Sequence, residues 1–212
     1  MNRRLLARLF AVLVVSTSSL LAVPVRAEDE AADALIKRLS TEVLNSIKAD
    51  PSIQAGDVSR IIALVDAKFM PNVNFKRMTA SAVGPAWRQV IPEQQKRLQE
   101  EFKTLLVRTY SGAVAQVNDL TFTVKPLRSS PEDKEVVVRT EVKGRGDPVQ
   151  LDYRLEKTPG EGAGWKIYNI NVMGVWLVET YRSQFAQEIN AKGIDGLIAT
   201  LTDRNKANAK KG

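Results

Sequence analysis

Apolar residues in the first half of the chain mostly recur every three or four positions, which is the spacing of one face of an α-helix. Four such stripes precede residue 111, and the first three end close to a proline, where helices commonly stop. Their apolar positions are Leu35, Leu39, Val43 and Ile47; Val58, Ile61, Ile62, Val65 and Phe69; Phe75, Met78 and Ala82; and Leu98, Phe102, Leu105, Leu106 and Tyr110. The pattern predicts four amphipathic helices whose charged residues face water.

From residue 119 the period changes to two, which is typical of strands with one apolar and one polar face. Residues 120–125, 136–143 and 149–156 alternate in this way. A fourth segment, 165–172, carries apolar groups on both faces, so we expect both of its faces to be covered. Short links rich in turn residues join these segments and predict an antiparallel meander.

The helical period returns after the strands, at Val178, Tyr181, Phe185 and Ile189. Two glycines, at 193 and 196, interrupt it before a last short helix. The order of elements predicts an α+β fold in which N-terminal and C-terminal helices cover a four-stranded antiparallel meander sheet.

The first residues have the features of a secretory signal peptide: a positive start, an apolar run and small residues before the expected cleavage at Ala27. An uncleaved anchor is disfavoured because serines and Pro24 break the apolar run. We therefore expect a signal peptide at 1–27, a folded domain at 28–202 and a basic, disordered tail at 203–212.

Composition excludes several chemistries. The 212 residues contain no Cys and no His, which removes disulfides, Ser-His-Asp and Cys-His catalysis and most zinc sites. The glycine-rich segment 160–164 lacks the Lys-Ser/Thr of a phosphate loop and reads as a hairpin turn. No pair of carboxylates is indicated to converge, so we expect no enzymatic activity, no cofactor and no metal site.

The net charge of +7 comes from the ends of the chain. Four basic residues lie in the predicted signal peptide, and the tail adds four against one acid, which leaves 23 of each sign in the predicted domain. A nucleic-acid-binding protein needs a basic stripe on its folded domain, and this chain does not indicate one.

The apolar residues leave two interpretations open. Phe122, Val138, Leu151 and Tyr153 share one face of the predicted sheet, and helices must cover that face. A packed core and an apolar ligand cavity are built from the same residue types, so periodicity alone does not separate them.

A resemblance favours the cavity. Residues 174–185, GVWLVETYRSQF, resemble the signature G-V-S-L-V-x-x-Y-R-S-Q-F of the MlaC (toluene-tolerance, auxiliary ABC-transport) family. Further similarity to that family lies at 71–78, at Gly84 with Trp87, in the predicted helix from Gln94 to Tyr110, and at 153–155, 165–168 and 193–198. The chain departs from the family pattern at three positions, with Asn74 and Asn169 in place of Asp and Trp176 in place of Ser. We expect these departures to reshape the mouth of the pocket, which leaves headgroup preference and lipid number open.

The resemblance implies a periplasmic phospholipid carrier, with acyl chains in an apolar cavity between sheet and helices. It implies two partners, an outer-membrane lipoprotein and porin complex and an inner-membrane ABC transporter with a lipid-binding ring, and a role in outer-membrane lipid asymmetry. The candidate lipid-binding residues, placed on apolar faces by periodicity and assigned to lipid by the resemblance, are Phe102, Leu106, Tyr110, Leu151, Tyr153, Ile170, Val172, Tyr181 and Phe185. Arg182 is a candidate for the lipid phosphate or for a structural ion pair.

Three other interpretations remain. Trp176 at a usually small position would suit a carrier of hopanoids or another hydrophobe. A structural adaptor would have a filled core and only protein partners. A periplasmic hydrolase would need converging acids or a Ser-Lys pair.

Overall fold

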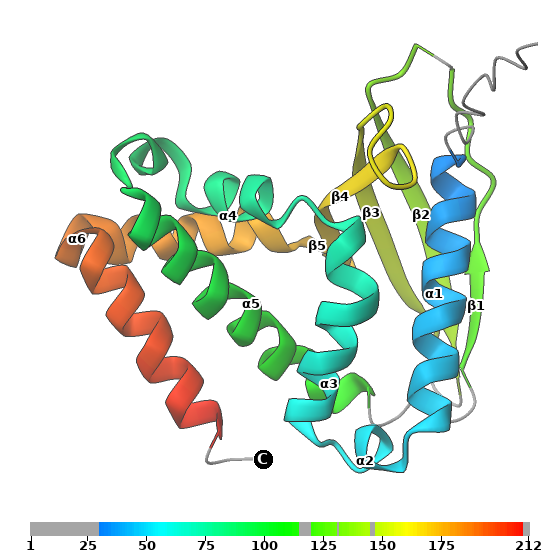
Figure 1. The fold of residues 1–212 in the computed structure, drawn as a ribbon, viewed down its shortest axis with the longest axis horizontal. Coiled ribbons are helices and arrows are strands. Elements are labelled where there is room, and N and C mark those ends of the chain that lie inside the picture. Colours follow the sequence, from blue (N-terminus) through cyan, green and yellow to red (C-terminus); the bar gives the residue numbers. More distant parts are fainter. Residues whose placement is uncertain (1–29, 115–119, 131, 145–146, 210–212) are drawn as a thin grey trace, which may run out of the picture.

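A five-stranded antiparallel sheet has a helix along one face and a group of helices beside one edge (Figure 1). The computed structural model describes residues 30–114, 120–130, 132–144 and 147–209, so the predicted signal peptide lies outside it. The strands, hydrogen-bonded in chain order, are β1 (Thr121–Val124), β2 (Glu135–Lys143), β3 (Val149–Lys157), β4 (Trp165–Val172) and β5 (Val175–Trp176). The helices are α1 (Ala32–Ala49), α2 (Pro51–Gln54), α3 (Val58–Leu64), α4 (Phe75–Val83), α5 (Pro92–Val114) and α6 (Leu177–Ala209), with the short turns η1 (Val65–Phe69), η2 (Met70–Asn72) and η3 (Gly84–Gln89). Within these ranges, no helix is both long and apolar enough to cross a membrane.

The α+β class and the antiparallel meander are confirmed, but the prediction of four strands is wrong by one. The fifth strand has two residues, and Trp176 and Val175 pair with Asn171 and Val172 of β4. A two-residue strand is too short to produce an alternating pattern, which is why periodicity does not reveal it.

A β-bulge explains the apolar residues on both faces of β4. Leu155 pairs with Ile167, whereas its neighbour Arg154 pairs with Asn169, so one residue of β4 is inserted between two successive pairs. The extra residue reverses which side chains face inward. Ile167 is buried before the bulge, and Ile170 lies over the same face after it. On the face opposite Ile170, Asn169 and Asn171 are also buried, at 2% and 4% exposed, so this part of the strand is covered on both faces as expected.

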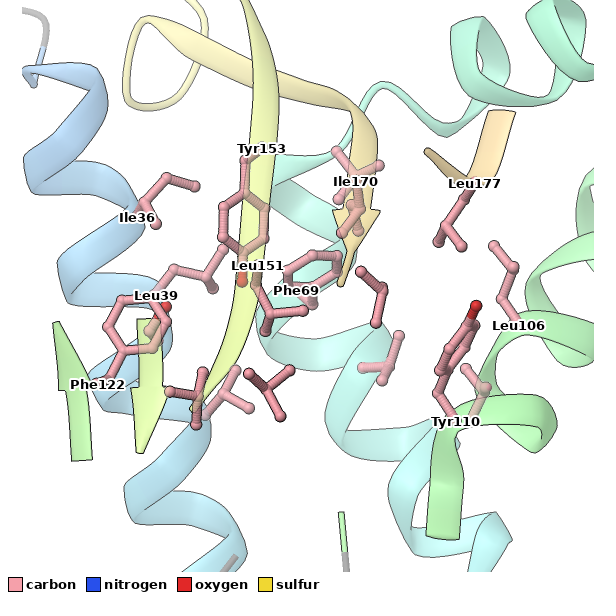
Figure 2. A pocket seen from close by; sticks show the side chains of 18 of the residues that line it. Ile36, Leu39, Phe69, Leu106, Tyr110, Phe122, Leu151, Tyr153, Ile170 and Leu177 are labelled. Carbon is pink, nitrogen blue, oxygen red and sulfur yellow. The ribbon is translucent and has the colours of Figure 1, made fainter. Parts of the chain in front are cut away.

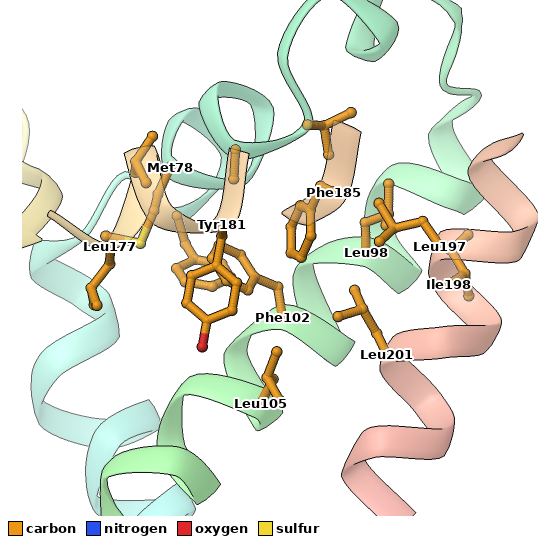
Figure 3. Packing of buried hydrophobic residues seen from close by; sticks show 14 of the residues in the cluster. Met78, Leu98, Phe102, Leu105, Leu177, Tyr181, Phe185, Leu197, Ile198 and Leu201 are labelled. Carbon is orange, nitrogen blue, oxygen red and sulfur yellow. The ribbon is translucent and has the colours of Figure 1, made fainter. Parts of the chain in front are cut away.

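Buried apolar side chains form separate clusters, and two of the larger ones share boundary residues. One cluster, between α1 and the inner face of the sheet, includes Leu35, Leu39, Val138, Leu155 and Ile167. A second cluster, among α4, α5 and α6, includes Met78, Leu98, Phe102, Phe185, Leu197 and Leu201 (Figure 3). Val73 and Ile170 contact both clusters and mark the boundary between them.

The C-terminal helix folds back at a glycine. Gly193 has φ 71° and ψ −174°, a left-handed conformation that side chains disfavour, and it divides α6 into two segments. The second segment runs beside α5 (Figure 1). The Asn205 amide donates hydrogen bonds to the Glu101 carbonyl (2.9 Å) and to its carboxylate (2.7 Å). The prediction of a disordered tail is therefore wrong for residues 203–209, which are helical; residues 210–212 lie outside the described ranges.

Candidate functional site

An apolar pocket of about 820 Å³ lies between α1, η1, α5 and the inner face of the sheet (Figure 2). This volume is at the upper end of the range for ligand pockets, roughly 300–1,000 Å³. Leu106 and Tyr110 lie on one side of it, and Ile36 and Leu39 lie on the opposite side. The pocket is partly open to solvent, so a ligand with a polar end need not be fully enclosed.

Six of the ten residues predicted to bind lipid line this pocket: Leu106, Tyr110, Leu151, Tyr153, Ile170 and Val172. The periodicity of each helix or strand determines which of its side chains face the pocket. Leu106 and Tyr110 are four positions apart on α5 and share a face of that helix. Leu151 and Tyr153 are two positions apart on β3, and the bulge turns Ile170 of β4 to the same side.

Three predicted aromatic residues lie outside the pocket. Phe102, Tyr181 and Phe185 pack against one another in the α4–α6 cluster, with ring centroids 4.9 Å apart for Phe102–Tyr181 and 5.1 Å for Phe102–Phe185 (Figure 3). Both contacts are edge-to-face, and Phe102 has no exposed surface. Their expected contact with ligand is corrected to core packing, because they point from α5 and α6 toward each other and not toward the sheet.

Arg182 also lies away from the pocket. Its Nε donates a hydrogen bond to the Ser81 carbonyl oxygen of α4 (2.8 Å) on the exposed side of that helix. Arg182 is not among the described residues that line the pocket, and the hydrogen bond described for it goes to a backbone oxygen and not to a carboxylate. The hydrogen bond instead joins α6 to α4.

The sequence did not assign the α1 and η1 walls of the pocket. Ile36, Leu39 and Val43 line it from α1, and Phe69 lines it from η1. Leu39, Val43 and Phe69 belong to predicted helical stripes, so the available signal was the stripe itself. A stripe identifies an apolar face and does not identify what that face contacts.

One wall of the pocket carries an uncharged polar group. Burial raises the pKa of the Tyr153 hydroxyl to about 12, against the opposing effect of hydrogen bonds with Ser40 and Thr140. The Thr140 hydroxyl donates to the Leu151 carbonyl oxygen at 2.6 Å. Tyr153 is therefore neutral near pH 7, and the pocket wall it forms suits an uncharged part of a ligand.

The three departures from the family pattern lie outside the pocket. Asn74 caps α4, where its side-chain oxygen accepts a hydrogen bond from the Arg77 backbone N–H (2.9 Å), as an Asp would. Asn169 accepts from the Val178 backbone N–H near the start of α6 (3.2 Å). The Trp176 ring is stacked beneath the Arg154 guanidinium at 3.9 Å. These residues hold helix ends and a strand edge, so the expectation that they reshape the pocket mouth is not supported by their positions.

Asn169 and Arg154 also meet at Glu179. Both donate to its carboxylate, at 2.8 Å and 2.5 Å. Although burial acts to raise it, these hydrogen bonds hold the pKa of Glu179 below its usual value. The charged form of Glu179 is thus part of the structure that fixes the start of α6 against β4.

The described residues contain no group of three or more Asp and Glu side chains that could hold a metal ion. The polar groups at the pocket are dispersed among apolar side chains. What this arrangement can do is enclose an apolar ligand.

The chain is similar to a known protein family, to a solved structure and to two characterised proteins. The family model described as MlaC protein matches residues 37–203. The solved structure of a phospholipid-binding protein from Ralstonia solanacearum, in complex with a phospholipid, is similar with a TM-score of 0.80 and 46% sequence identity, over 84% of this chain and 98% of that one. The toluene tolerance protein ttg2D of Pseudomonas putida is 28% identical over 163 residues, 76% of this chain and 74% of that protein. The intermembrane phospholipid transport system binding protein MlaC of Haemophilus influenzae is 20% identical over 203 residues, 95% of this chain and 94% of that protein.

Proposed function

This chain belongs to the MlaC family, and we propose that it is a periplasmic phospholipid carrier that encloses acyl chains in the pocket between sheet and helices. The observation that carries the proposal is the apolar pocket of about 820 Å³ in a chain 46% identical to a protein solved with a phospholipid bound. The alternative of a structural adaptor with a filled core does not account for such a pocket.

The physical role of the pocket follows from the cost of exposing acyl chains to water. Each CH₂ group exposed to water costs about 0.8 kcal/mol. A chain of roughly 15 such groups costs on the order of 12 kcal/mol, and a second chain doubles that cost. A pocket wall of leucine, isoleucine, valine and phenylalanine removes most of this barrier while a lipid crosses an aqueous compartment.

We further propose that the carrier moves phospholipid between an outer-membrane lipoprotein complex and an inner-membrane ABC transporter, and so maintains outer-membrane lipid asymmetry. The names of the Haemophilus influenzae and Pseudomonas putida relatives support a role in such a system. The carrier would perform no chemistry and would use no cofactor of its own. Because Trp176 lies outside the pocket, it no longer favours hopanoids over phospholipids as the ligand.

Transfer between vesicles tests the carrier function. Donor vesicles hold a fluorescent phospholipid together with a quencher, acceptor vesicles hold neither, and the purified chain is added at increasing concentrations. We expect the rate at which fluorescence appears to rise in proportion to protein concentration, because each molecule carries lipid through water. A protein that binds the phospholipid and yet leaves the transfer rate at that of vesicles alone would contradict the carrier function and leave only binding.

A further inference from the structure

A single cationic side chain lies among the described residues that line the pocket, and it is Lys103 of α5. Lys103 is three positions before Leu106 and seven before Tyr110, so all three share the helix face that borders the pocket. Its side chain keeps 23% of its surface exposed. A residue that both lines the pocket and reaches water lies where the pocket meets solvent.

An ion pair with η1 holds Lys103 at this position. Its Nζ donates to the Asp66 carboxylate of η1 at 2.7 Å, which joins η1 to α5. Val65 and Phe69, from the same π-helical turn as Asp66, line the pocket. The turn therefore supplies apolar wall and a carboxylate at the rim within five residues. Asp66 is 45% exposed, and ion pairs with this much exposure are weak and readily exchanged.

We propose that Lys103 binds the phosphate group of a phospholipid whose acyl chains occupy the pocket. This inference rests on the proposed function. An ammonium group has three N–H donors, and in the described structure Asp66 accepts from one of them. The remaining donors are available to a phosphate oxygen at the rim, and lysine binds phosphate as a compact positive charge. The negative charge of Asp66 positions Lys103 and at the same time repels the phosphate.

The assignment of the phosphate to Lys103 replaces the earlier candidate, Arg182. Arg182, the arginine considered for phosphate from the sequence, lies on the outer side of α4 and α6. Lys103 is the cation that a headgroup would meet if the acyl chains lay between Leu106 and Leu39. The pocket is lined mainly by apolar side chains, and its charged described lining residues are Lys103 and Asp147. Of these two, Lys103 can attract the anionic phosphate of a lipid whose acyl chains lie against the apolar wall.

The test compares two lipids with the same fluorescent acyl chains, phosphatidylglycerol and diacylglycerol, bound to the delipidated full-length chain. Lys103→Met keeps most of the apolar stem and removes the charge. We expect it to weaken phosphatidylglycerol binding about tenfold, as for the loss of one charge-assisted hydrogen bond, and to leave diacylglycerol binding unchanged. Asp66→Asn removes the repulsion and is expected to strengthen phosphatidylglycerol binding roughly twofold to fivefold. Circular dichroism and thermal melting establish that both variants fold.

Lys96→Met is the matched control, because Lys96 lies on the same helix with 79% of its side chain exposed, outside the pocket. It should bind both lipids as the wild type does. Equal weakening of both lipids by Lys103→Met, or no weakening of either, would overturn the assignment. Saturable binding of inorganic phosphate alone would identify a free-phosphate site and overturn it as well. A wild type that binds neither lipid would refute the proposed function itself. A wild type that binds both lipids, together with a Lys103→Met variant that binds both equally well, would leave the proposed function intact and overturn only the role of Lys103.

Discussion

Leu106→Arg is expected to give a folded protein that carries no acyl lipid. Leu106 projects from α5 into the pocket and faces the α1 wall (Figure 2). An arginine there occupies space that an acyl chain would fill. It also places a charge next to the CH₂ groups of any lipid that enters, and this contact is unfavourable because the charge loses water without gaining a partner. Because Leu106 is only partly buried, the guanidinium can reach water at the rim, so the fold should survive. Phospholipid extracted from the purified variant should fall at least about tenfold, the loss expected when roughly two CH₂ contacts disappear.

Thr104→Arg is the control for Leu106→Arg. It adds the same charge to the same helix, at a residue whose hydroxyl bonds back to the Glu100 carbonyl at 2.9 Å and which does not line the pocket. Its lipid content should equal that of the wild type. A well-folded Leu106→Arg protein with the wild-type amount of lipid would contradict the placement of acyl chains in this pocket.

Phe102→Ala is expected to cause the largest loss of stability among the predicted site residues. Phe102 is fully buried and contacts the rings of Phe75, Tyr181 and Phe185, at centroid distances of 5.7, 4.9 and 5.1 Å. Removal of a buried phenylalanine typically costs about 3–5 kcal/mol of unfolding free energy, through lost burial and the cavity that remains. Denaturant unfolding should show this loss, whereas phospholipid should still co-purify with the folded fraction because Phe102 lies outside the pocket.

Phe122→Ala is expected to have the opposite balance of effects, with a smaller loss of stability and a larger loss of lipid binding than Phe102→Ala. Phe122 is partly buried on β1 and lines the pocket, so its removal should cost less stability and should weaken lipid binding more than Phe102→Ala does. If Phe102→Ala removed the lipid without a loss of stability, Phe102 would contact the ligand and the division between core and pocket would be wrong.

Periodicity predicted where the helices and strands lie, because burial on one face of an element leaves a regular pattern in its sequence. The long helix α5 and strands β2 to β4 fall within a few residues of the predicted ranges. Features without a repeating pattern were missed: the two-residue strand β5, and the bulge that turns Ile170 toward the pocket. The tail was misread because Asn205 is a polar residue whose burial depends on Glu101, a partner distant in the sequence.

The candidate site was predictable only in part for a related reason. Phe102 and Leu106 both belong to one broad apolar stripe on α5, yet Phe102 faces α6 and Leu106 faces the pocket. The stripe records that each side chain avoids water and does not record which neighbour covers it. Separation of core from pocket required the packing of α5 against two different partners, which is a property of the tertiary structure.

Native mass spectrometry of the full-length protein, purified without detergent, tests most directly whether the pocket encloses phospholipid. The proposal predicts a species heavier than the polypeptide by the mass of a phospholipid, which collisional activation releases and which lipid extraction identifies. The Leu106→Arg protein should appear at the mass of the polypeptide alone. A wild-type protein found only at its polypeptide mass, with no phospholipid in the extract even after incubation with phospholipid vesicles, would contradict the account.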